Sequence, residues 1–236
     1  MLPVQNVTGF ILNYKRTKKE MAGIIRKLKF LSPLVPYFIL NKVRRNEDKK
    51  DLEQWRKNGC PVPPPHIVKQ IVIAEHQKKY GNSILVETGT FRGDMVEVQK
   101  KRFKKIISIE LGDELFAKAK KRFSGDKNVF LVHGDSGKML PEILTGINEP
   151  AIFWLDGHYS SGMSVKGDTE CPIFEELDAI FNAGRFNHIL LIDDARCFNG
   201  TGDYPSIEAL TAYIKNKNVQ FQFEVKDDII RYVIKN

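Results

Sequence analysis

The sequence has few cysteines and no long hydrophobic run. Its three cysteines, Cys60, Cys171 and Cys197, are odd in number and show no C-x-x-C spacing. A disulfide framework and a structural zinc site are therefore not expected, and the pattern fits a reducing cytoplasm. The longest apolar stretch, residues 30–40, includes two prolines and is too short to span a bilayer. Residues 1–10 lack the features of a secretory signal peptide, so we expect a cytoplasmic protein.

Two common nucleotide-binding motifs are also absent. The sequence contains neither the G-x-G-x-x-G of dinucleotide enzymes nor the G-x-x-x-x-G-K-[ST] of phosphate loops. It has instead I-L-V-E-T-G-T-F-R-G at residues 84–93. The apolar run predicts a buried strand, and the glycines predict a turn at its carboxyl end, where α/β sheets bind nucleotides.

The spacing of this turn suits a ligand without phosphate. The two absent motifs cradle phosphates with backbone N–H groups, whereas S-adenosylmethionine carries a sulfonium, an ammonium and a carboxylate. We expect Glu87 to face the ammonium and Gly89, followed by Thr90, to let the backbone approach the ligand. Gly93 would let the following helix pack on the strand.

Two further apolar runs are followed by polar residues suited to the same ligand. Glu110 ends a run about 20 residues beyond the glycine turn, where α/β nucleotide sites use an acid to hold the ribose hydroxyls. Asp135 and Ser136 follow the next run, and we expect them to contact the adenine. These three residues complete a predicted binding site for the cofactor.

Residues 66–236 resemble the class I S-adenosylmethionine-dependent methyltransferases. Within that class the sequence is most similar to the small-molecule and sugar O-methyltransferases. The resemblance is carried by E-T-G-T-x-x-G, Glu110, Asp135, Leu155-Asp156-Gly157 and Ile192-Asp193-Asp194. Any one of these elements is weak, but acids at the ends of successive predicted strands form a fairly specific set.

The order of expected elements indicates an α/β protein with a Rossmann-like, doubly wound, mostly parallel sheet. The resemblance implies seven strands with an antiparallel C-terminal hairpin, whose turn would be Asp227-Asp228. The strands are expected near 84–87, 106–110, 129–132, 152–155, 189–192, 219–226 and 229–234. The helices of this domain are expected near 66–80, 93–103, 113–123, 137–144, 171–183 and 206–215.

Residues 1–60 are expected to form a basic, helical N-terminal extension, with helices near 17–30 and 47–57. A cluster of four prolines within residues 61–65 marks a stiff boundary to the domain at 61–236. The net charge of +8 is concentrated in the first fifth of the chain. Two interpretations stand: a solvated helical face, or peripheral attraction to a membrane surface or an anionic substrate. No nucleic-acid partner is expected, because no basic stripe is interleaved with aromatics.

Three carboxylates are predicted to converge at adjacent strand ends, Asp156 on one strand and Asp193 and Asp194 on the next. They would repel one another unless a cation neutralises them. A divalent ion such as Mg²⁺ is one solution, and it would bind substrate hydroxyls and lower their pKa. The resemblance maps the metal role onto these three residues. The alternative is that Asp193 or Asp194 caps a turn and Asp156 holds the cofactor or backbone.

His158 is the candidate general base, since an imidazole titrates near neutral pH and Asp156 could orient it. Similar enzymes often carry an acid at the position of His158. Its roles as base, metal ligand or pocket wall therefore all stay open. Tyr159, Lys166 and Arg196 are expected to contact the substrate.

The leading hypothesis is methyl transfer to a hydroxyl of a sugar, glycan or other small molecule. The alternative is a non-catalytic module that binds the cofactor or an anionic surface. A nucleotide-linked oxidoreductase is a third, and the glycine spacing counts against it. A homo-oligomer is compatible with the sequence, which carries no signal for the oligomeric state.

Overall fold

The computed structural model describes residues 37–157, 171–184, 186–217 and 219–235, with side chains from residue 46 onward. Contacts divide the chain into two units, Met1–Asp51 and Leu52–Asn236. Helix α2 covers Tyr37–Lys57, so the helix predicted near 47–57 exists and begins earlier than expected. The helix predicted near 17–30 lies outside the described residues.

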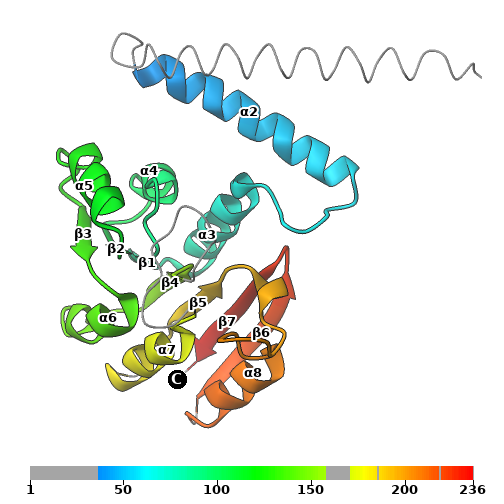
Figure 1. Ribbon diagram of the computed structural model, residues 1–236, viewed down its shortest axis with the longest axis vertical. Coiled ribbons are helices and arrows are strands. Elements are labelled where there is room, and N and C mark those ends of the chain that lie inside the picture. The colour runs from blue at the N-terminus through cyan, green and yellow to red at the C-terminus, as the bar shows by residue number, and fades with distance from the viewer. Residues whose placement is uncertain (1–36, 158–170, 185, 218, 236) are drawn as a thin grey trace, which may run out of the picture. The chain divides into compact units, whose positions relative to one another are not determined.

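The second unit is built on one seven-stranded sheet in the order β3-β2-β1-β4-β5-β7-β6 (Figure 1). Strands β1 to β5 are parallel, and β7 runs antiparallel to both β5 and β6. The predicted fold class, with its C-terminal antiparallel hairpin, is therefore confirmed. The strands are β1 Ile84–Thr88, β2 Lys105–Glu110, β3 Val129–His133, β4 Ala151–Leu155, β5 Ile189–Ile192, β6 Gln220–Lys226 and β7 Ile229–Lys235.

Helices cover both faces of the sheet. Apolar side chains of α3, α4 and α5 pack into one buried cluster, and those of α6, α7 and α8 pack into the other. The described helices of this unit are α3 His66–Tyr80, α4 Asp94–Gln99, α5 Asp113–Arg122, α6 Ser136–Leu144, α7 Ile173–Asn182 and α8 Ile207–Lys215. This arrangement is the doubly wound one that the alternation of elements predicted.

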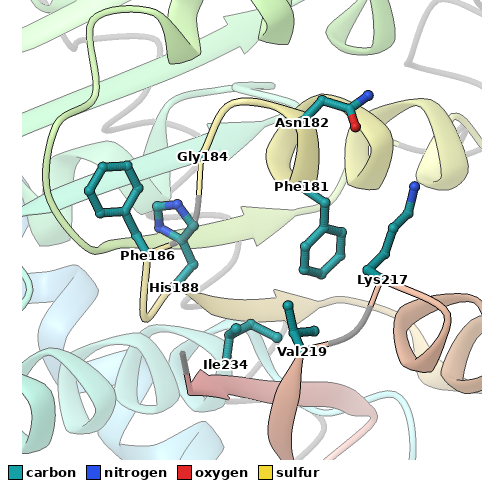
Figure 2. Close-up of a pocket in the computed structure, with 8 residues that line it drawn as sticks. All are labelled: Phe181, Asn182, Gly184, Phe186, His188, Lys217, Val219 and Ile234. Carbon is teal, nitrogen blue, oxygen red and sulfur yellow. The ribbon is translucent and has the colours of Figure 1, made fainter.

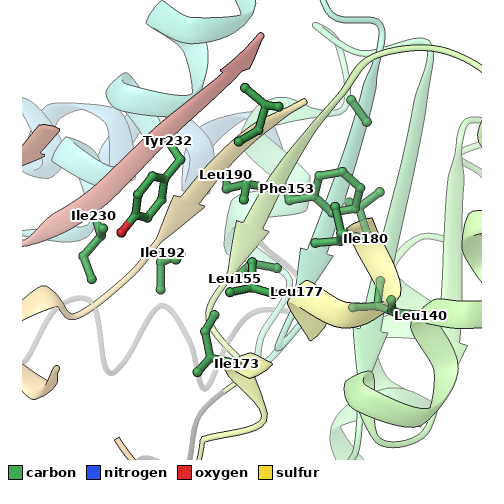
Figure 3. Close-up of a cluster of buried hydrophobic side chains, with 14 of the residues drawn as sticks. Leu140, Phe153, Leu155, Ile173, Leu177, Ile180, Leu190, Ile192, Ile230 and Tyr232 are labelled. Atoms are coloured by element: carbon green, nitrogen blue, oxygen red, sulfur yellow. The ribbon is translucent and has the colours of Figure 1, made fainter. Parts of the chain in front are cut away.

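The central strands are buried on both sides, which explains their unbroken apolar runs. Successive side chains of a strand point to opposite faces. Phe153 accordingly joins the cluster under α6 and α7, which Figure 3 shows, while Trp154 joins the cluster on the other face. Both rings are at most 1% exposed. Each strand therefore anchors two layers of helix at once.

Local signals account for most element ends. Gly81 ends α3 in the left-handed region, with its N–H bonded to Gln77. Asp227 and Asp228 have φ of 54° and 62°, and positive φ at both central residues is what a type I′ hairpin turn requires. The prediction for 93–103 was too long, because α4 ends at Gln99. The chain turns there, and Phe103 enters the core before β2 begins.

The strand order places the crevice of the sheet. Strand β1 lies between β2 and β4, so the chain departs to opposite sides of β1. In open α/β sheets the ligand binds at the carboxyl ends of the strands beside such a reversal. No helix in the described part of the chain is long and apolar enough to cross a membrane.

Candidate functional site

The glycine turn after β1 has a backbone that side chains would obstruct. Gly89 has φ of 88°, and a Cβ there would lie 2.5 Å from the carbonyl oxygen of Asp156. The turn is therefore in direct contact with the end of β4. Gly93 has φ of 74°, and a Cβ there would lie 2.5 Å from the ring of Phe123. Gly93 thus allows close packing on the end of α5, while Met95 and Val96 of the following helix share a buried cluster with Leu85 of β1.

Glu87 is a buried acid at the end of β1, with an exposure of 2%. The hydroxyl of Ser108 on β2 donates to Glu87 Oε2, and Thr90 Oγ1 lies 2.6 Å from the same hydroxyl. Burial raises the pKa of Glu87 to about 8, and nearby Asp156 adds to this rise. A cation beside this acid would favour its ionised form.

Glu110 joins the glycine turn to the end of β2. Its two carboxylate oxygens accept the N–H groups of Phe91 and Gly112, at 2.7 Å and 2.8 Å. Each carboxylate oxygen has a second lone pair, so Glu110 can still accept hydrogen bonds from ribose hydroxyls. The N–H groups of Gly89 and Thr90 also bond to β2, at Ile109 O, 3.0 Å away.

Asp135 and Ser136 lie at the carboxyl end of β3, beside the same edge of the sheet. Asp135 caps α6 by accepting the N–H of Gly137 at 2.9 Å. Ser136 donates to Glu176 Oε1 at 2.6 Å. Glu176 comes from α7 and is 2% exposed, and it was not predicted. A Cβ on Gly157 would lie 3.0 Å from this Glu176 oxygen, which places Glu176 under the end of β4.

The second part of the site is an acidic cluster at the ends of β4 and β5. The Asp193 side chain is 1% exposed, and its Oδ1 accepts the N–H of Asp194 at 2.8 Å. Burial and the neighbouring carboxylate of Asp156 raise the pKa of Asp193. The structure therefore brings the three predicted aspartates close enough to interact electrostatically.

Lys69 supplies a cation to this cluster, and it was not predicted. Its ammonium donates to Asp193 Oδ2 and lies 3.4 Å from Asp194 Oδ1. Burial lowers the pKa of Lys69, but attraction to Asp193, Asp156 and Asp194 outweighs it, so the pKa is raised overall. Lys69 thus stays charged at neutral pH.

Arg196 holds the outer side of the cluster. Its guanidinium bonds to Asp194 Oδ1 at 2.9 Å and to Asp228 Oδ2, while its N–H bonds to Asp228 Oδ1 at 2.9 Å. Asp228 belongs to the hairpin turn before β7. Arg196 is therefore tied to two carboxylates, although 38% of its side chain is exposed. The predicted residues His158, Tyr159 and Lys166 lie outside the described residues.

The donor set does not fit a divalent ion as it stands. In the described ranges, no three His, Cys, Asp or Glu side chains are grouped so that they could hold a metal. The oxygens of Asp193 and Asp194 that would have to bind Mg²⁺ face the Lys69 ammonium instead. The predicted Mg²⁺ is therefore not supported by this arrangement of side chains.

A hollow lies at the opposite end of the strands, near the start of β5 (Figure 2). It has a volume of about 190 Å³, and Phe181, Phe186 and His188 are among the residues that line it. His188 Nδ1 accepts the N–H of Ala151 at 3.1 Å, and burial lowers its pKa to about 4. This neutral imidazole ties β4 to β5. The hollow is distant in the fold from the carboxyl-end crevice.

Signals for the two missed residues exist in the sequence. Lys69 lies in the first turn of a helix, where the helix dipole disfavours a cation. Glu176 is an acid on the apolar stripe formed by Ile173, Leu177 and Ile180. A charge in an unfavourable local position indicates a partner elsewhere in the fold.

Several solved structures share this fold. TomG of Streptomyces achromogenes, an O-methyltransferase involved in tomaymycin synthesis and solved with SAM, gives a TM-score of 0.54 at 12% identity, covering 80% of this chain and 89% of TomG. An SAH-bound O-methyltransferase of Bacillus cereus gives 0.52 at 12% identity, covering 80% and 90%. SAH-bound PaMTH1 of Podospora anserina gives 0.52 at 14% identity, covering 86% and 99%.

The sequence itself matches no protein-family profile and no curated protein. The structural likeness nevertheless shows the fold of the class I S-adenosylmethionine-dependent methyltransferases. Two of the structural neighbours described above are O-methyltransferases, PaMTH1 is a methyltransferase, and each was solved with SAM or SAH. The fold resemblance drawn from the sequence is therefore confirmed at the level of the structure.

Proposed function

We propose that this chain is an S-adenosylmethionine-dependent methyltransferase that acts on a hydroxyl of a sugar, glycan or other small molecule. The observation that carries the proposal is the crevice beside β1, where Glu87, the Gly89 turn and Glu110 meet. Three features of that crevice match a phosphate-free adenosyl ligand: a buried acid, a glycine turn with no side chain at position 89, and a carboxylate with spare lone pairs.

The residues of the crevice fit the cofactor by their chemistry. Glu87 would pair with its ammonium, and Glu110 would accept its ribose hydroxyls. Gly89 would allow close approach of the backbone, and Asp135 and Ser136 would lie toward the adenine. When bound, the cofactor supplies a methyl group activated by a sulfonium. The chain's own task is then to align the acceptor and remove its proton.

The acidic cluster would receive the acceptor. A hydroxyl has a pKa far above 7, so its proton needs a base as the oxygen attacks the methyl group. We assign that role to His158, oriented by Asp156 at the end of β4. Tyr159 and Lys166 are the proposed substrate contacts. Arg196 would act through Asp194 and Asp228, since both carboxylates hold its guanidinium.

Calorimetric titration with S-adenosylhomocysteine tests the proposal. We expect saturable binding by the wild-type protein and at least about tenfold weaker binding by Glu110→Gln. Glutamine would turn an amide donor toward the N–H of Phe91 or Gly112 and would lose the charge that attracts the ribose hydroxyls.

Glu142→Gln is the matched control, because Glu142 is an exposed acid of α6. It should bind S-adenosylhomocysteine as the wild type does. Absence of binding heat in the wild-type protein, or equal affinity in Glu110→Gln, would contradict the proposed cofactor site.

A further inference from the structure

Burial of the charged Lys69 side chain costs free energy unless other groups in the fold compensate its charge. Only 15% of its side chain is exposed, and it lies in the first turn of α3, where the helix dipole disfavours positive charge. A buried charge is tolerated when it is paired and hydrogen-bonded. Lys69 is paired with Asp193 and Asp194, which follow β5, 124 and 125 positions later. The ion pair therefore joins α3 to the floor of the proposed acceptor site.

The hydrogen bonds of the two carboxylates show which oxygens remain for a divalent ion. Asp193 Oδ1 accepts the N–H of Asp194, while Asp193 Oδ2 accepts Lys69. Asp194 Oδ1 is shared between Lys69 and Arg196. A divalent ion needs several such oxygens at once, and here both positive side chains already hold them.

We propose that Lys69 is the resident cation of this acidic cluster: its ammonium occupies the position of a divalent metal ion and donates a hydrogen bond to the acceptor oxygen. The chemical meaning of this step rests on the proposed function, whereas the occupancy of the cluster by Lys69 does not. Methyl transfer by this chain then proceeds without a metal.

The chemistry of an ammonium suits this role. Lys69 has three N–H donors, of which two are directed to Asp193 and Asp194. In this proposal the third donates to an acceptor hydroxyl and lowers the pKa of that hydroxyl, as a metal would do more strongly. Lys69 remains protonated beside the carboxylates, so it acts as a donor and leaves the role of base to another group.

Competition with Mn²⁺ tests the occupancy directly. Electron paramagnetic resonance measures free Mn²⁺ in the presence of wild-type protein, Lys69→Met and Lys69→Arg. We expect Lys69→Met to bind Mn²⁺ at least about tenfold more tightly than the wild type, because its carboxylates lose their cation. Lys69→Arg keeps a cation and should resemble the wild type. Lys118→Met is the control, since Lys118 pairs on the exposed face of α5.

Equal Mn²⁺ affinity in wild type and Lys69→Met, whether tight or undetectable, would overturn the proposal. Circular dichroism shows whether Lys69→Met folds. If Lys69→Met does not fold, the amide NMR spectrum of the wild-type protein provides the test instead. Added Mn²⁺ should leave the amide signals of Asp193 and Asp194 unbroadened, and selective broadening of those signals would overturn the proposal.

Titration with S-adenosylhomocysteine on the same samples separates this inference from the proposed function. Wild-type protein that binds both S-adenosylhomocysteine and Mn²⁺ at the cluster would refute the role of Lys69 alone. Wild-type protein that binds neither would refute the proposed function and leave Lys69 as the resident cation.

Discussion

At the scale of single residues, Glu87 shows how function opposes stability. An acid that burial holds at a pKa of about 8 is costly to ionise without a cationic partner. A bound ammonium would remove much of that cost, since an opposite charge favours the ionised form. The acid is therefore better explained by a cationic ligand than by the packing around it.

This gives a pH-dependent prediction for Glu87→Gln. The ordinary pKa of 4.5 applies in the unfolded chain and about 8 in the folded one, so the folded state holds the proton more tightly. Wild-type stability should fall as pH rises from about 4.5 to 8. Glutamine stays neutral, so the variant should match the wild type at pH 4 and exceed its free energy of unfolding at pH 8.5 by more than about 1 kcal/mol.

Thermal melts at pH 4 and pH 8.5 measure this difference, with Glu142→Gln as the exposed control. The same variant should lose affinity for S-adenosylhomocysteine, because the partner of the ammonium is gone. A variant less stable than the wild type at pH 8.5 would show that the ionised acid stabilises the fold, against this account.

At the scale of helices and strands, the sequence predicted most elements because local and tertiary preferences agree. The runs Leu85-Val86 and Phe153-Trp154 are buried on both faces, so an unbroken apolar pattern could only be a central strand or a buried helix segment. Gly81 marked the end of α3 in the sequence, and Asp227-Asp228 marked the turn between β6 and β7. The end of α4 was missed because the core position of Phe103, rather than a capping residue, determines it.

The candidate site was only partly predictable. Acids at the strand ends could be found because parallel strands end at one edge of the sheet. Lys69 and Glu176 could not be assigned, because their partners depend on how α3 and α7 pack on that sheet. The three aspartates need a cation near Asp193, and the fold supplies the Lys69 side chain where an ion was predicted.

Asp135 offers a prediction at the scale of a helix. As the N-cap of α6, it should cost about 1 kcal/mol of stability when replaced by alanine. Asp135→Asn retains a capping oxygen and should melt close to the wild type. Chemical denaturation compares the two variants.

If Asp135 also contacts the adenine, both variants should bind S-adenosylhomocysteine more weakly than the wild type. Unchanged affinity in Asp135→Asn would restrict the residue to its capping role. An equal loss of stability in both variants would argue against the cap.

At the scale of the whole molecule, the two ends of the strands differ in the side chains that they carry. The carboxyl ends of β1, β2 and β5 carry the buried acids Glu87, Glu110 and Asp193, and Lys69 pairs with Asp193. The amino end of β5 carries the neutral His188 and a hollow lined by both apolar and polar side chains (Figure 2). This separation explains why a Rossmann-like sheet can bury charge at one edge and remain stable through its two apolar layers.

The basic extension is the part of the molecule that the site does not explain. The sequence placed the domain boundary at residue 61, whereas contacts divide the described chain after Asp51. We predict that the basic extension is attracted to a membrane surface or an anionic substrate. Assembly of the chain into a homo-oligomer is also a prediction.

The central claim is that the crevice beside β1 binds the adenosyl cofactor. A crystal structure of the protein grown with S-adenosylhomocysteine tests it most directly. We predict the ribose within hydrogen-bond distance of Glu110, the ammonium beside Glu87, and the Lys69 ammonium still between Asp193 and Asp194. Ligand bound in the hollow near His188, or a crevice that stays closed by its own side chains, would contradict the account.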